Sequence, residues 1–218
     1  TGVQTCALPI CRRLANLLMK AEAMRRAEQL SRSLERYVSP RTARMAREYA
    51  ATGALPAPMR EEVCVLFADA RGFTELSQEM EPEVLLNVLS GHLETLVSLV
   101  YRHGGYVDKF SGDGLMAVFD GDDMVYKCCM CALEMLEASR ERLANEGIRI
   151  HQMGIGINRG EAVIGNLGSD EHLDYTLIGK TVNLAARLCS MAQSLSIVVS
   201  ESVRDELVGS LGVDFTNE

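Results

Sequence analysis

Apolar runs and amphipathic stretches alternate along the chain and predict a layered protein of strands and helices. The run EEVCVLFADA is rich in β-branched and aromatic residues, which is typical of a buried strand ending at Asp69. A hairpin is predicted at 106–119 and further strands at 149–157, 161–167 and 196–200. Helices are predicted at 82–103, 122–145, 180–193 and 201–208. The order strand-helix-strand-strand-helix-strand favours an α/β fold of the α+β sandwich type. We expect a ferredoxin-like βαββαβ core with helices on one face of a largely antiparallel sheet.

The segment before this core is also helical by its pattern. Apolar residues recur at three- and four-residue steps over 12–36. The stripe is narrow, which suits a coiled-coil seam, although a helix packed against its own domain is an alternative. Ser39 and Pro40 suit the N-cap and first position of a second helix, which we expect to run to about Ala50 before a linker rich in Gly and Pro.

These patterns divide the chain into an arm and a larger folded domain. We expect a helical signalling arm with its linker at 11–59 and the folded domain at 60–218. The first ten residues, TGVQTCALPI, show no periodicity and look like a translated sequencing adapter, so we interpret residues 1–10 as an assembly artefact. An ordinary flexible terminus is the alternative.

Composition and charge narrow the class of protein. Of the 218 residues, 47% are hydrophobic and 24% charged, which is typical of a globular protein. Neither a signal-peptide pattern nor a run of eighteen apolar residues occurs, so we expect reduced cysteines and a cytoplasmic location. The net charge of −8 hides a basic arm, but its arginines alternate with leucines and glutamates as on a solvated helix face. No nucleic-acid partner is expected.

Two carboxylates stand where strands end or turn. Asp69 closes the first strand, and Asp113 lies in the Ser-Gly-Asp-Gly turn of the segment 106–119. If these strands are neighbours, about 5 Å apart, both side chains can reach one ion. Paired carboxylates with few other ligands suit Mg²⁺, which keeps waters and takes further ligands from phosphates. Ser-Gly-Asp-Gly is also good turn chemistry, so by itself the motif leaves both interpretations open.

A second candidate site lies in DYTLIGKTVNLAARL. Asn183 and Arg187 are four residues apart and therefore project from one face of a helix. A delocalised cation beside an amide suits a developing negative charge on phosphorus and a ribose oxygen. A solvated helix face is the alternative. The GKT at 179–181 is no P-loop, because the glycine required five positions before Gly179 is Asp174.

Five ordered segments together resemble the catalytic domain of class III nucleotide cyclases, and most closely the class IIIb adenylate cyclases of bacteria. The segments are RYVSPRTARM (36–45), VLFADARGFTELS (65–77), GGYVDKFSGDGLMAVF (104–119), GIGINRGEAVIGNLGS (154–169) and DYTLIGKTVNLAARL (174–188). Relatives usually continue through a further strand pair beyond the LGVDFTNE at which this chain stops. We therefore interpret the domain as C-terminally truncated.

The resemblance implies an obligate homodimer whose active sites lie at the interface and use residues of both chains. Asp69 and Asp113, assisted by the carbonyl of Ala70, would be the ligands of two divalent ions, Mg²⁺ or Mn²⁺. Asn183 and Arg187 would orient the ribose and stabilise the transition state. The backbone of the RGFT segment would hold the phosphates, namely at Gly72, Phe73 and Thr74.

The resemblance also implies a purine specificity. Lys109 and Thr176 occupy the purine-reading positions and complement adenine, whose N1 is an acceptor and whose exocyclic amine is a donor. The expected activity is conversion of ATP to 3′,5′-cyclic AMP and pyrophosphate, regulated by a sensor domain upstream in a longer parent protein. A guanylate or relaxed-specificity cyclase and a catalytically silent nucleotide-binding or dimerisation module are the alternatives.

Overall fold

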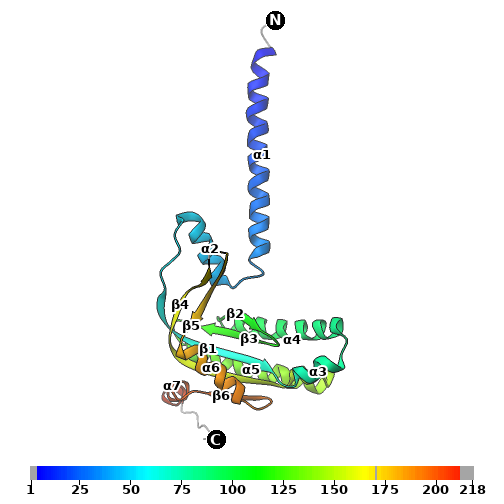
Figure 1. Cartoon of the computed structure of the whole chain (residues 1–218), viewed down its shortest axis with the longest axis vertical. Coiled ribbons are helices and arrows are strands. Elements are labelled where there is room, and N and C mark those ends of the chain that lie inside the picture. The colour runs from blue at the N-terminus through cyan, green and yellow to red at the C-terminus, as the bar shows by residue number, and fades with distance from the viewer. Residues whose placement is uncertain (1–3, 170, 212–218) are drawn as a thin grey trace.

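The structure is a computed structural model that describes residues 4–169 and 171–211 (Figure 1). The elements in chain order are α1 (Gln4–Leu34), α2 (Pro40–Thr52), β1 (Met59–Ala70), α3 (Phe73–Glu79), α4 (Pro82–Arg102), β2 (Tyr106–Ser111), β3 (Gly114–Phe119), α5 (Met124–Glu146), the 3-10 helix η1 (Arg149–His151), β4 (Met153–Ser169), β5 (His172–Ile178), α6 (Lys180–Met191), β6 (Ser196–Val199) and α7 (Glu201–Leu211). Most of the LGVDFTNE end, 212–218, and the start of the predicted artefact, 1–3, lie outside the described residues.

One sheet of six strands carries the domain, and β1 lies near its centre. The strand order is β2-β3-β1-β4-β5, with antiparallel pairing throughout, while β6 pairs with β4 in parallel. Because β1 has a partner on each side and helices over its apolar residues, its sequence is an almost continuous apolar run. The predicted fold class is confirmed.

The two faces of the sheet bury separate cores. Cys64, Leu66 and Ala68 point from β1 into the larger core, which α4 and α5 close. Val63 and Val65 point to the opposite face, where Ala185 of α6 packs. The prediction that the helices share one face is therefore wrong for α6, which returns the chain from β5 to β6 across the other face.

A glycine permits the close approach of α6 to the sheet. A Cβ added at Gly156 of β4 would lie 2.0 Å from the backbone nitrogen of Cys189 and 2.5 Å from the carbonyl oxygen of Ala185. Any side chain at this position would therefore push the helix away from β4. The sequence GIGI predicted a strand here but did not predict what lies over it.

The segment 153–169 is one strand of 17 residues rather than the two strands predicted at 149–157 and 161–167. The positions between the two predicted strands, Asn158 to Gly160, stay paired with β1. β4 pairs with β1 over 153–164 and with β5 over 163–169. Pairing with β1 therefore keeps the backbone extended through the Asn-Arg-Gly sequence.

The N-terminal arm has two parts with different surroundings. Helix α1 projects away from the domain, and every residue from Ile10 to Leu34 is exposed (Figure 1). It begins at Gln4, earlier than predicted, and does not pack against its own domain. The apolar residues of its predicted seam are 55–66% exposed: Leu14, Leu17, Met24, Leu30 and Leu34.

Helix α2, in contrast, is attached to the sheet. Its predicted cap is confirmed, because the Ser39 side chain accepts a hydrogen bond from the Thr42 backbone at 3.2 Å and Pro40 begins the helix. The Arg41 guanidinium pairs with Glu61 of β1 at 2.6 Å and with Asp120, just after β3, at 2.5 Å. It also lies 5.0 Å from the centre of the Tyr106 ring. Arg41 thus ties the arm to both β1 and the β2–β3 hairpin.

Among the described residues, α4 is the one helix whose length and composition would allow it to cross a membrane. It has a mean hydropathy of 1.4 over its most apolar window. In this structure its buried residues Leu96, Leu99 and Val100 belong to the larger core, which accounts for much of its apolar character.

Candidate active site

Asp69 and Asp113 lie together, as the sequence predicted. β1 and β3 are antiparallel neighbours, and the turn that carries Asp113 passes over the end of β1. A Cβ on Gly114 would lie 2.2 Å from the carbonyl oxygen of Ala68, so only glycine allows this approach. Burial and then the nearby Asp69 carboxylate raise the pKa of Asp113 above its usual value. Two carboxylates are thus held within electrostatic reach of each other.

Arg71 supplies a cation next to this pair, and the sequence analysis did not single it out. Its guanidinium makes an ion pair with Asp69 at 2.7 Å. The same group donates to the carbonyl oxygens of Cys189 and Ala192, at the C-terminal end of α6. Arg71 therefore connects the end of β1 to the far end of the helix that carries the second candidate site.

The residues predicted to hold phosphates follow directly after Arg71. Gly72 has a left-handed backbone with φ of 76°, and Phe73 and Thr74 form the first positions of α3. Ala70 is buried at the end of β1 and pairs with Met153. These residues therefore border the carboxylate pair, while their contact with phosphate stays a prediction.

Asn183 and Arg187 project from α6 as predicted, and both are exposed. The opposite face of the helix packs on the sheet through Val182 and Ala185. Asn158 of β4 fixes the start of the helix by donating to the carbonyl of Thr181 at 2.9 Å. Within the described part of the chain, neither the Asn183 nor the Arg187 side chain has a hydrogen bond or an ion pair. The structure therefore does not join them to Asp69 or Asp113.

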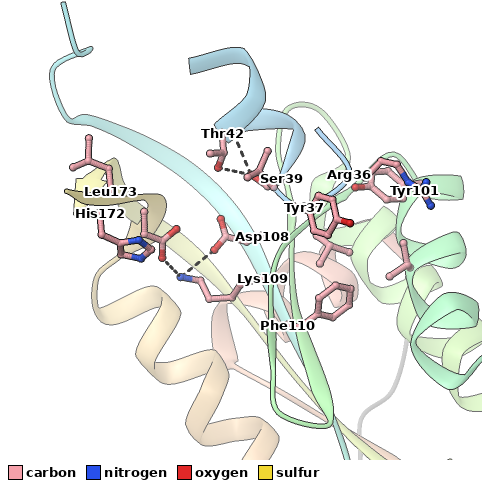
Figure 2. A pocket seen from close by; sticks show the side chains of 14 residues that line it. Arg36, Tyr37, Ser39, Thr42, Tyr101, Asp108, Lys109, Phe110, His172 and Leu173 are labelled. Carbon is pink, nitrogen blue, oxygen red and sulfur yellow. Dashed lines mark hydrogen bonds and ion pairs between the residues drawn. The ribbon is translucent and has the colours of Figure 1, made fainter. Parts of the chain in front are cut away.

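Two carboxylates, Asp108 and Asp174, bring Lys109 and Thr176 into one polar cluster. Figure 2 shows the part of this cluster formed by Asp108 and Lys109. The Lys109 ammonium lies 3.1 Å from Asp174 Oδ2 and 3.6 Å from Asp108 Oδ2. Thr176 donates its hydroxyl hydrogen bond to the same Asp108 oxygen at 2.8 Å. The cluster borders a cavity of about 640 Å³ that is also lined by Tyr37 and Phe110.

This cluster joins strands at opposite ends of the sheet order. Four strand spacings separate β2 from β5, which would be about 19 Å in a flat sheet. The 2.8 Å bond between Thr176 and Asp108 therefore requires a strongly curled sheet. A β-bulge contributes, because Val107 pairs with Ala117 and Lys109 with Met116, which leaves Asp108 without an opposite residue.

The sequence analysis missed Arg71, Asp108 and Asp174. Each lies within two residues of a predicted site residue, so the sequence already placed them close to the candidate sites. The contacts of Asp108 and Asp174, however, are set by the curl of the sheet and the bulge, and Arg71 contacts the end of α6 more than 100 residues away. No local pattern indicates these contacts.

The carboxylate pair fits the divalent ions that the sequence predicted. Two carboxylates and the carbonyl of Ala70 are hard oxygen donors, which Mg²⁺ and Mn²⁺ prefer. Burial raises the pKa of Asp113, and the Asp69 carboxylate raises it further. A cation bound between the two groups would offset this repulsion. Among the residues described, no group of three or more His, Cys, Asp or Glu that could hold a metal ion occurs.

The chain belongs to the class III nucleotide cyclase family. The family model described as "Adenylate and Guanylate cyclase catalytic domain" matches residues 55–218. The chain is therefore a nucleotide cyclase domain, of the lyase class of enzymes, and the resemblance found in the five sequence segments is confirmed.

Solved structures of this family superimpose on the chain. The adenylyl cyclase CyaB from P. aeruginosa has a TM-score of 0.65 and 32% identity, covering 71% of this chain and 84% of that one. The guanylyl cyclase Cya2 has a TM-score of 0.64 and 32% identity, covering 69% of this chain and 80% of that one. The chain is thus equally similar to an adenylyl and a guanylyl cyclase.

Curated relatives match over a shorter region. An adenylate cyclase of Anabaena cylindrica is 32% identical over 149 residues, which is 64% of this chain and 29% of the relative. An uncharacterized protein of Mycobacterium tuberculosis is 37% identical over 130 residues, which is 60% of this chain and 24% of the relative. The chain therefore spans roughly a quarter of the length of these relatives.

Proposed function

We propose that the chain is an adenylate cyclase domain that converts ATP to 3′,5′-cyclic AMP and pyrophosphate. The observation that carries the choice of ATP is the cluster of Lys109 and Thr176. An ammonium can only donate, which suits the acceptor N1 of adenine. A threonine oxygen can accept from the exocyclic amine. Guanine presents the opposite edge, an N1–H donor and an O6 acceptor.

Asp69 and Asp113 would hold two divalent ions, Mg²⁺ or Mn²⁺, together with the carbonyl of Ala70. Bound there, the ions supply the positive charge that makes the ribose 3′-hydroxyl more acidic and stabilises the phosphate oxygens. Arg71 keeps the Asp69 carboxylate oriented through its ion pair. The start of α3, at Gly72 to Thr74, lies beside this pair and would receive the triphosphate through backbone N–H groups.

Asn183 and Arg187 would act on the reacting centre by orienting the ribose and by neutralising charge at the α-phosphorus. Their exposure and lack of partners within the described chain support a site completed by a second copy. In a symmetric homodimer, each active site then combines Asp69 and Asp113 of one chain with Asn183 and Arg187 of the other. Lys109 and Thr176 of a given site would come from the same chain as its Asn183 and Arg187.

We further propose that the catalytic domain is cytoplasmic and that α1 relays a signal from a sensor domain upstream in a longer parent protein. Its exposed apolar stripe suits pairing with the α1 of a second chain. Arg41 and Thr42 connect the following helix α2 to the hairpin and to β5. Insertion of one residue near Gln29 should alter activity or its regulation, because it rotates the seam by about 100°; an unchanged profile would contradict a helical relay.

Cyclic nucleotide production tests the proposal directly. The chain is incubated with Mn²⁺ and either ATP or GTP over a series of protein concentrations. Cyclic AMP formed with a specific activity that rises with protein concentration supports both the substrate and the shared site. Comparable cyclic GMP would favour relaxed specificity, which the equal similarity to Cya2 keeps as the second candidate. No product from either nucleotide would contradict the proposal and favour a nucleotide-binding module.

A further inference from the structure

Asp108 is a buried carboxylate with a role that the proposed reaction does not yet use. Its side chain is only 3% exposed, and it sits at the bulge of β2. Its Oδ2 atom receives both the Thr176 hydroxyl at 2.8 Å and the Lys109 ammonium at 3.6 Å. Burial raises the pKa of Asp108, whereas the hydrogen bond from Thr176 and the charge of Lys109 act in the opposite direction.

The hydrogen bond to Asp108 restricts what Thr176 can do toward a ligand. A hydroxyl has one hydrogen and two lone pairs, and an ionised carboxylate can only accept. Because the Thr176 hydrogen is committed to Asp108, its oxygen is left as an acceptor. Thr176 is itself 3% exposed, so water does not readily replace this bond.

We infer that Asp108 is a positioning residue for purine specificity, which it sets by holding the Thr176 hydroxyl as an acceptor. In that state Thr176 receives the exocyclic amine of adenine, while the O6 of guanine meets a lone pair and is rejected. Lys109, held between Asp108 and Asp174, donates to N1 of adenine and meets the N1–H of guanine. This inference rests on the proposed function, because it assumes that these residues face the purine.

A purely structural role for Asp108 is the competing explanation, since the same bond joins β2 to β5. The two roles differ in what they change. A structural tie affects ATP and GTP alike, whereas an orienting carboxylate affects their ratio. The ratio of the activity, or of the affinity, for ATP to that for GTP is therefore the quantity to measure.

The test compares Asp108→Asn with the unaltered chain. The Asn amide can donate to Thr176 Oγ1, which frees the hydroxyl hydrogen to donate to guanine O6. The ratio of kcat/KM for ATP to that for GTP is measured with Mn²⁺. The ratio of dissociation constants is measured with 3′-deoxy-ATP and 3′-deoxy-GTP, which lack the attacking hydroxyl and so report binding without turnover.

We expect Asp108→Asn to lower both ATP-to-GTP ratios by about tenfold or more, as for a hydrogen-bonding site presented with the wrong donor. Thr176→Val, which removes the hydroxyl, should lower the ratios by a similar factor. Adding Asp108→Asn to Thr176→Val should then change the ratio no further. Asp120→Asn is the matched control, because Asp120 also ties the hairpin to a neighbouring element but reaches only Arg41. Its ratio should be unchanged.

Each outcome decides the inference separately from the cyclase proposal. If the ATP-to-GTP ratios of Asp108→Asn are unchanged, the inference is overturned even if cyclic AMP is made. If Asp108→Asn does not fold, unchanged ratios in Thr176→Val overturn it in the same way. An unaltered chain that does not discriminate between the two 3′-deoxynucleotides, or binds neither, would overturn it as well. Discrimination in binding that is lost in Asp108→Asn would support it even in a chain that makes no cyclic nucleotide, an outcome that contradicts only the proposed reaction.

Discussion

Two carboxylates on the same hairpin have opposite surroundings. Asp113 lies in the turn between β2 and β3, and Asp108 lies at the bulge in β2. Burial is the largest cause of a raised pKa for both. The next influence has opposite signs: the like charge of Asp69 raises the pKa of Asp113 further, whereas the hydrogen bond donated by Thr176 lowers the pKa of Asp108.

This difference separates a carboxylate that we propose as a metal ligand from one whose partners lie within the chain. Asp113 faces the Asp69 carboxylate, whose charge Arg71 partly offsets, and a bound cation would reduce the remaining repulsion. Asp108 already has a hydroxyl and an ammonium as partners, so it gains little from an added ion. One hairpin can therefore serve a metal site at its tip and a recognition site at its base, because the strand pairing holds the two apart.

The largest expected effect comes from removing the charge at the tip of the hairpin. Asp113→Asn keeps the size of the side chain but removes a metal ligand, and should lower cyclic nucleotide formation by at least about 10²–10³-fold. Asp122→Asn is the control, because Asp122 is an exposed carboxylate a few residues further along. Near-normal turnover by Asp113→Asn, measured with Mn²⁺ and ATP, would remove Asp113 from the site.

Mixing two inactive variants tests whether the two chains of a dimer contribute different residues to one site. Asp113→Asn and Arg187→Ala should each be inactive alone. Their heterodimer has one site with both defects and one site with neither. An equimolar mixture that exchanges subunits freely should therefore recover about a quarter of the normal activity. A mixture as inactive as its components would mean that both residues serve the same site from one chain.

The packing of α6 should matter to stability by a few kcal/mol. Gly156→Ala places a methyl group 2.0 Å from the Cys189 nitrogen, and should lower the free energy of unfolding by about 2–3 kcal/mol. Gly209→Ala is the matched control, because no atom lies within 4 Å of its Cβ position and alanine favours the helix. Equal stability of the two variants in urea titrations would show that the helix yields without cost.

The smallest expected effects are on stability, and they should have opposite signs at Asp113 and Asp108. Without divalent ions, Asp113→Asn removes the repulsion with Asp69 and should raise the free energy of unfolding by up to about 1 kcal/mol. Asp108→Ala leaves the buried Thr176 hydroxyl without its acceptor and should lower it by about 1–3 kcal/mol. Urea denaturation in EDTA measures both, and destabilisation by Asp113→Asn would contradict the proposed contrast.

Several features of the fold and site were readable from short stretches of sequence. The β1 strand, the Ser39–Pro40 cap and the face shared by Asn183 and Arg187 depend on residues a few positions apart. The pairing of Asp69 with Asp113 needed one further assumption, that their strands are neighbours, and the structure confirms it. The substrate and the roles of these residues stay predictions.

Other features depend on segments far apart in the chain. The continuity of β4 follows from its pairing with the distant strand β1, and the close approach of α6 depends on a glycine on a strand that precedes it by some 30 residues. The contact of Arg71 with the end of α6 spans more than 100 residues.

The sequence by itself determined most of the elements and their order, because helix and strand periodicity, capping and turn formation act over a few residues. Only the tertiary structure decided which side chains meet. Thr176 and Asp108 are 68 positions apart and belong to strands at opposite ends of the sheet order. Their hydrogen bond exists because the sheet curls and a bulge re-aims one carboxylate, and both are properties of the whole sheet.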